Sequence, residues 1–299
     1  MWWRRSDGTL VRDLSNTRRV MPYLMRGRNE AAVYAEHEIG IRNTDVFIRA
    51  WNQDNPLRRI DVFHITVWAL RDAMLRYPGV NRFVADGRLY DRKGVWFSYA
   101  VKQRLDLGTP LVLVKRRFDT DESFAAMVDG MYEQEARATS ADRSGVDKEL
   151  GLLMKFPGFV RRIIMAFVRG ADRMGMLPRG YIEGDPMYAS AFFANMASFG
   201  MPAVYHHLYE YGTTGAFCSL GKPVTEPGSP TSGDERRRRV ALRWTFDERA
   251  DDGLAGWFAM RRIRQILEDP EAAGLTVEAL PSGAVAPATS EGSPAPVES

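Results

Sequence analysis

Five charged residues are crowded into one short stretch: Asp247, Glu248, Arg249, Asp251 and Asp252. They directly follow an aromatic and β-branched segment, a composition that predicts a strand ending in a turn. Carboxylates at this density repel one another, shift in pKa, or pair with arginine. Such a corner can be catalytic, and it can equally be a salt-bridged loop, because ion-pair networks also perturb pKa values. The residues alone leave both interpretations open.

The run 246–253, Phe-Asp-Glu-Arg-Ala-Asp-Asp-Gly, precedes a predicted helix that ends in Leu-Glu-Asp-Pro-Glu. This pattern resembles the C-terminal motif, His-x-x-x-Asp-Gly, of the superfamily that contains the acyltransferase subunits of 2-oxo acid dehydrogenase complexes and chloramphenicol acetyltransferase. Asp252 and Gly253 fit that motif, whereas Glu248 stands where the general-base histidine belongs. The resemblance implies that Glu248 takes the proton of the acyl acceptor, provided that burial raises its pKa.

The segment 24–31, Leu-Met-Arg-Gly-Arg-Asn-Glu-Ala, is similar to the opening helix of the same superfamily. In the family an arginine of this region pairs with the aspartate of the C-terminal motif. The resemblance therefore implies an ion pair between Arg28 and Asp252. Considered without the family, Arg28 is equally consistent with a surface residue on an amphipathic helix.

The segment 189–200 resembles the central strand of the family, which ends in a hydroxyl residue that donates to the oxyanion of the tetrahedral intermediate. Here Ala194 occupies the hydroxyl position, and Asn195, whose amide can donate a hydrogen bond, follows it. The return strand ends in Gly-Lys at Lys222. The resemblance implies that coenzyme A or an acyl-coenzyme A binds near Ser198, Gly200 and Lys222.

Two of the four histidines, His206 and His207, are adjacent and follow this predicted strand. On a strand their side chains would face opposite ways, so only one could reach a site. A histidine of this kind is either a structural group or a general base. No histidine or cysteine cluster has the spacing of metal ligands, so no metal site is expected, and the single Cys218 excludes an internal disulfide framework.

The elements that position these residues predict an α/β (α+β) fold. Periodicity predicts helices over 18–37, 60–77, 119–139 and 254–267, strands over 36–51, 95–101 and 110–114, and a hairpin turn over Asp86–Tyr90. The resemblance covers 18–271 and implies a chloramphenicol acetyltransferase-like domain. Such a domain has a mixed central sheet flanked by helices and forms a homotrimer with active sites between subunits. Outside this domain we expect an N-terminal arm at 1–17 and a disordered tail at 272–299. Within the domain we expect a flexible loop at 226–235.

The segment 149–176 exceeds what the family carries at this place. It is apolar on one side, and between 155 and 173 it carries five basic residues on the other. A basic amphipathic helix can lie on an anionic membrane surface, and it can equally cap a cleft or a subunit interface.

The composition limits the classes of protein to which this chain can belong. The 299 residues carry a net charge of +3 and are 45% hydrophobic, enough for a substantial core. No recognisable nucleic-acid module is present, and the run Arg236–Arg239 is either a solvated loop flank or a phosphate contact. No apolar run reaches the ~18 residues of a membrane span, no signal peptide or lipoyl-bearing domain is recognised, and a cytoplasmic protein is expected.

Two functional hypotheses follow. The first is coenzyme A-dependent acyl transfer to a small-molecule acceptor, with Glu248 in place of the usual histidine. The second is a catalytically inactive relative that acts as a trimeric scaffold or binds an acyl group, a lipid or a membrane surface.

Overall fold

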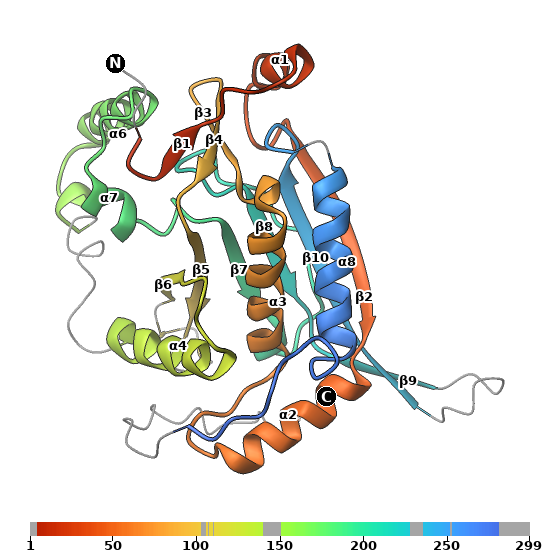
Figure 1. Cartoon of the computed structure of the whole chain (residues 1–299). Helices are drawn as coiled ribbons and strands as arrows, with labels where there is room; N and C mark the ends of the chain where they lie inside the picture. Colours follow the sequence, from red (N-terminus) through yellow and green to blue (C-terminus); the bar gives the residue numbers. More distant parts are fainter. Residues whose placement is uncertain are drawn as a thin grey trace.

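The computed structural model describes residues 5–102, 106, 108–109, 111–139, 151–227, 236–251 and 253–280. Its centre is a mixed sheet with the strand order β2-β10-β8-β7-β5-β6, to which β9 adds beside β10 (Figure 1). The pairs β5–β7 and β7–β8 are parallel, and all other pairs are antiparallel. The strands of this sheet are β2 (Ala32–Gly40), β5 (Val95–Val101), β6 (Val112–Phe118), β7 (Ala191–Asn195), β8 (Ala216–Leu220), β9 (Val224–Pro227) and β10 (Arg236–Asp247).

A second, three-stranded sheet has the order β1-β4-β3. Its strands are β1 (Gly8–Leu10), β3 (Phe83–Ala85) and β4 (Arg88–Arg92). The predicted hairpin turn is confirmed, because Asp86 and Gly87 have φ angles of 48° and 68°, as a tight turn between two paired strands requires. Since β1 pairs with β4, the predicted N-terminal arm is part of the fold from residue 5 onwards.

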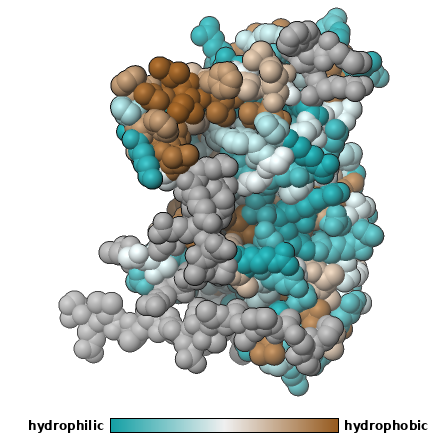
Figure 2. All heavy atoms as spheres, turned by 90° about the vertical axis from the view of Figure 1, so that its left-hand side faces the viewer, coloured by the Kyte–Doolittle hydropathy of each residue, from teal (hydrophilic) through white to brown (hydrophobic). Residues whose placement is uncertain are grey.

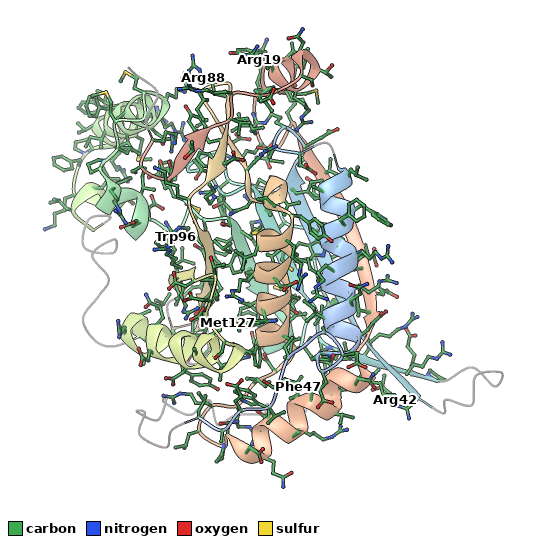
Figure 3. All side chains as sticks on the ribbon, in the orientation of Figure 1. Arg19, Arg42, Phe47, Arg88, Trp96 and Met127 are labelled. Atoms are coloured by element: carbon green, nitrogen blue, oxygen red, sulfur yellow. The ribbon has the colours of Figure 1, made fainter. Side chains whose placement is uncertain are left out.

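Helices α3 and α8 lie side by side against one face of the large sheet (Figure 1). Phe47 of α2 and Met127 of α4 are buried where those helices meet the same core (Figure 3). The helices are α1 (Asn16–Leu24), α2 (Arg42–Asp54), α3 (Val62–Arg76), α4 (Phe124–Thr139), α6 (Gly158–Arg173), α7 (Arg179–Gly184) and α8 (Leu254–Glu268), with short 3₁₀ turns η1 (Pro78–Asn81) and η2 (Met196–Phe199). This arrangement confirms the predicted mixed sheet flanked by helices.

Two of the predicted elements are wrong. The helix predicted at 18–37 ends at Leu24, and the chain then turns into β2. The strand predicted at 36–51 ends at Gly40 and continues as α2, whose buried residues Thr44, Phe47 and Trp51 recur with helical spacing. The alternating apolar residues on which the strand prediction rested include Val46, which is exposed.

The disordered tail was predicted to begin at residue 272, and the structure corrects this boundary. Leu275 is buried in the main core, and the side chain of Asn55 binds both the carbonyl of Glu278 and the N–H of Leu280. Residues 272–280 therefore belong to the domain. Residues 281–299, like 228–235 of the predicted flexible loop, lie outside the described part of the chain.

Helix α6 lies beside α7 and β1, away from the large sheet (Figure 1). None of its residues is buried, and Phe159, Ile163 and Phe167 form a solvent-facing stripe at helical spacing. Phe167, for instance, is 76% exposed. The stripe is part of an apolar area near the top of the molecule in Figure 2, which we call the α6 patch. Its exposed apolar side chains are Leu152, Met154, Phe156, Phe159, Ile163, Phe167, Met174 and Met176.

Candidate active site

The charged corner after β10 contains a buried ion pair. Asp247 and Arg249 are 3% and 5% exposed, and Nε and Nη2 of Arg249 lie 2.8 and 2.7 Å from the two carboxylate oxygens of Asp247. Arg249 Nη1 also donates to the carbonyls of Met25 and Arg26, both at 3.3 Å. The bidentate ion pair and these two hydrogen bonds hold the end of β10 against the segment after α1. For these two residues the salt-bridged interpretation of the corner is confirmed.

Glu248 lies between these two buried residues, and its side chain is exposed. Its backbone is held on both sides, because its N–H donates to the carbonyl of Ala31 at 3.0 Å and Arg18 Nη2 donates to the carbonyls of Glu248 and Arg249. The exposed carboxylate of Glu248 is therefore attached to a backbone that hydrogen bonds hold in place. The single chain does not cover the Glu248 side chain.

Arg28 is buried, which rules out the surface-arginine interpretation. Its guanidinium donates to the backbone carbonyls of Tyr209, Glu210 and Gly212 at 3.2, 3.0 and 2.6 Å. Burial lowers the pKa of Arg28, and the charge of Asp247 opposes this shift. The predicted partner, Asp252, lies outside the described residues, so the Arg28–Asp252 pair remains a prediction.

The predicted coenzyme A residues gather at the end of β7. Ser198 Oγ donates to the carbonyl of Asn195 at 2.6 Å, and Gly200 ends the η2 turn with a φ angle of 70°. The N–H of Lys222 donates to the carbonyl of Met201 at 2.8 Å, and its side chain is exposed. Asn195 Oδ1 is buried and has no hydrogen-bond partner in the structure. The structure thus brings these four predicted residues together.

Glu248 and Asn195 lie at different levels along the strands of the large sheet. The strand registers align Asn195 with Leu220, and Leu220 with Leu242 of β10. Glu248 follows the far end of β10, beyond Phe246, which is aligned with Ala216. At about 3.3 Å per residue, Glu248 lies roughly 20 Å along the sheet from Asn195. We call the regions around Glu248 and around Asn195 the two candidate half-sites.

His206 and His207 lie in an irregular segment and not on a strand. The prediction that they face opposite ways is therefore wrong, since their rings stack on each other with centroids 4.4 Å apart. The ring of His206 also stacks on Phe217 at 4.0 Å, and its carbonyl accepts a hydrogen bond from Thr245 of β10. Burial lowers the pKa of His206, and the charge of His207 adds to this. Both histidines therefore lie near the Glu248 end of the sheet.

With Tyr34 and Tyr205, the two histidines line an open hollow of about 440 Å³. Its walls are aromatic, and His207 is exposed. The hollow could receive a flat or apolar group. Among the described residues, no group of three or more His, Cys, Asp or Glu side chains is placed to hold a metal ion.

Sequence reasoning missed Glu210, which organises the Arg28 segment. Its carboxylate accepts hydrogen bonds from the N–H groups of Arg28 and Asn29 at 3.1 and 2.9 Å. The approach is so close that a side chain at Gly27 would lie 2.8 Å from the Glu210 carboxylate. About 180 residues separate the partners, and nothing in the local sequence signals such a contact.

Comparison with solved structures shows the fold. A structure described as a probable dihydrolipoamide acetyltransferase from Listeria monocytogenes has a TM-score of 0.56 at 14% identity, over 90% of this chain and 99% of the other. The dihydrolipoamide acetyltransferase of Azotobacter vinelandii has a TM-score of 0.51 at 16% identity, over 89% and 94%. A truncated catalytic core of the 2-oxoacid dehydrogenase multienzyme complex from Thermoplasma acidophilum has a TM-score of 0.52 at 14% identity, over 88% and 99%.

No protein-family model matches the sequence, and no curated protein matches it. The chain thus has the fold of 2-oxo acid dehydrogenase acyltransferase catalytic domains, and the predicted chloramphenicol acetyltransferase-like architecture is confirmed.

Proposed function

We propose that this protein is a coenzyme A-dependent acyltransferase that works as a homotrimer, with Glu248 as the general base and Asn195 as the oxyanion donor. The observation that carries this proposal is the separation of the two half-sites within one chain. A second subunit whose Asn195 region packs against Glu248 of the first would complete the site. It would also bury Glu248, as a carboxylate base at neutral pH requires.

In this mechanism coenzyme A enters along Ser198, Gly200 and Lys222. Glu248 of the neighbouring subunit takes the proton from a small-molecule acceptor, and the amide of Asn195 donates to the oxyanion that forms as the acyl group is attacked. The Asp247–Arg249 pair holds the Glu248 backbone in place. The fold of the acetyltransferases with solved structures supports this class of reaction.

Calorimetry with coenzyme A and acetyl-coenzyme A tests the cofactor assignment. Wild type should bind at micromolar dissociation constants, and Lys222→Met should bind about tenfold more weakly, because a charge-assisted contact to phosphate is lost. Lys155→Met, outside both half-sites, is the matched control and should bind like wild type. Light scattering on the same sample should give the mass of a trimer. Absence of any binding heat would reject the coenzyme A assignment.

A second candidate function is favoured by the α6 patch. Monomeric proteins rarely expose large contiguous apolar patches without a function. The patch is accompanied by the exposed basic residues Arg162, Arg169 and Arg173, whose charge is complementary to anionic lipid headgroups. No helix in the described ranges is long and apolar enough to cross a membrane. We propose contact with an anionic bilayer surface through 155–173, which is compatible with an active or an inactive site.

Vesicle flotation tests this contact. Wild type should float with phosphatidylglycerol-containing vesicles and not with pure phosphatidylcholine. The double variant Phe159→Ser/Phe167→Ser should bind roughly 100-fold more weakly, because two phenyl groups no longer enter the bilayer. Trp257→Ser removes an exposed aromatic side chain from α8 and should float like wild type. Equal flotation of the double variant would contradict the proposal.

A further inference from the structure

A cavity of about 250 Å³ lies between the β5–β6 edge of the large sheet, α7 and the segment before β1. Its walls include Ser6, Arg92, Trp96, Lys115 and Tyr188. Trp96 is labelled on β5, below α7, in Figure 3. Three strand spacings separate β5 from β10, so the cavity lies roughly 14 Å across the sheet from the Glu248 strand. It is distinct from both half-sites.

Two partly buried cations of this cavity, Arg92 and Lys115, have no carboxylate partner within the described residues. Arg92 donates from Nη1 to Thr213 Oγ1 at 3.1 Å and from Nη2 to the Thr213 carbonyl at 2.6 Å. Lys115 Nζ donates to the carbonyls of Ile182 and Asp185, which leaves one of its three N–H groups free. The positive charges of both side chains are therefore not neutralised by direct contact.

The two carboxylates that line the cavity are already engaged. Both oxygens of Asp7 accept from Arg5, at 2.8 and 3.0 Å. Glu183 accepts from Arg179 Nε at 2.8 Å. Neither carboxylate is therefore available to neutralise the two unpaired cations.

Burial lowers the pKa of Arg92 to about 9 and that of Lys115 to about 7. Arg92 lowers the pKa of Lys115 further, and the carboxylates of Asp185, Asp7 and Glu183 oppose the shift. A bound anion would favour the charged form of both groups. The electrostatics of the cavity thus select a negative ligand.

Three further polar atoms on the walls are buried and have no hydrogen-bond partner: Ser6 Oγ, Arg92 Nε and Tyr188 Oη. Each of them can donate a hydrogen bond. Buried polar atoms without partners are uncommon in folded proteins and call for an explanation. Their residues line the cavity, so a ligand rich in acceptor oxygens is a candidate partner for these donors.

We propose that this cavity binds the phosphate group of a phosphate monoester. The two unpaired positive charges match its double negative charge, and its terminal oxygens match the unpaired donors. The volume suits a phosphate with a short organic group and is too small for a typical drug-sized ligand. The proposal does not depend on acyl transfer.

Calorimetry with inorganic phosphate and with glycerol 3-phosphate, at constant ionic strength set with chloride, tests the site. Wild type should show saturable binding, and Lys115→Met should bind at least about tenfold more weakly. Arg76→Met is the matched control, because Arg76 lies on α3 outside the cavity, is exposed and is paired with Asp72. Lys222→Met should leave phosphate binding unchanged, which separates this site from the coenzyme A site.

Tyr188→Phe removes only the unpartnered hydroxyl and keeps the ring that packs on Tyr181 and Tyr211. It should fold normally and weaken binding several-fold, so the test does not depend on the stability of Lys115→Met. Absence of saturable binding to wild type, in solution and on vesicles, would overturn the proposal. Unchanged affinity of both variants would also overturn it.

The phosphate monoester could be soluble or could be a lipid headgroup. Arg5 links the cavity to the α6 patch, because it binds Asp7 on the wall and Asp172 in the last turn of α6. If the source is a lipid, wild type should prefer phosphatidic acid to phosphatidylglycerol vesicles of equal charge, and Lys115→Met should lose that preference. If the source is soluble, glycerol 3-phosphate should bind and this vesicle preference should be absent.

Discussion

Replacing Arg249 by methionine is expected to lower the free energy of unfolding by about 3–5 kcal/mol, because it leaves the buried carboxylate of Asp247 without its partner. The pair is among the most deeply buried ion pairs in the described chain, with side chains 6% and 1% exposed. The loss also frees the two carbonyls of the segment after α1. Urea denaturation of wild type and variant measures the difference.

The chain offers a matched control for this prediction. Asp86 and Arg88 form an ion pair with the same sequence separation at 3.0 Å, but both side chains are about one third exposed. Arg88→Met should cost at most about 1 kcal/mol, since exposed pairs contribute little. The double variant Asp247→Asn/Arg249→Met should recover part of the loss, because no buried charge remains. A cost for Arg249→Met no larger than that of Arg88→Met would refute the argument from burial.

Glu248→Gln is expected to reduce the rate of acyl transfer by about 10²–10⁴-fold, the usual contribution of a general base. The variant keeps the shape and the backbone contacts of Glu248, so its stability should not change. Glu268→Gln, at the exposed end of α8, is the control and should retain full activity. Rates of acetyl transfer from acetyl-coenzyme A to a small-molecule acceptor, measured for wild type and both variants, test this prediction.

Mixing variants tests whether each site is shared between subunits. Glu248→Gln and Asn195→Ala chains should each be inactive. When they are unfolded and refolded together in equal amounts, about one quarter of the sites combine an intact Glu248 with an intact Asn195 from the neighbouring chain. Roughly a quarter of the wild-type activity should then return. No recovery in a mixed trimer would mean that the two residues do not act in one site.

The parts of the fold that the sequence predicted well are those with a strong local signal. Helix α3 begins at Asp61, whose carboxylate accepts from the N–H of Phe63, and it ends before Pro78. The Asp86-Gly87 turn needs positive φ angles that few residue pairs provide. By contrast, β2 alternates between exposed and more buried residues from Tyr34 to Gly40, a pattern that crosses the boundary between the predicted helix at 18–37 and the predicted strand at 36–51. The sequence prediction therefore divided this strand between two elements, and long-range pairing with β10 decides its structure.

The residues of the candidate site could be predicted from the sequence only where they lie in a segment that resembles a family motif. The run around Glu248 and the segment around Asn195 were found, and the structure places each at a strand end. The sequence did not reveal that Arg28 is held by backbone carbonyls, because carbonyls carry no residue-specific signal. The cavity around Lys115 was missed because its walls come from segments far apart in the chain, and no one of them is unusual alone.

The pairing of β2 with β10 has a consequence for how the chain is made. These strands are roughly 200 residues apart, and contacts of this range are slow to form because a long loop must close first. During translation, β2 is synthesised early and has no partner strand until β10 has been made. The hydrogen bonds of Asn55 with residues 278–280 can form only after that. The sheet is therefore completed only when almost the whole domain has left the ribosome, and until then the edge of β2 remains unpaired.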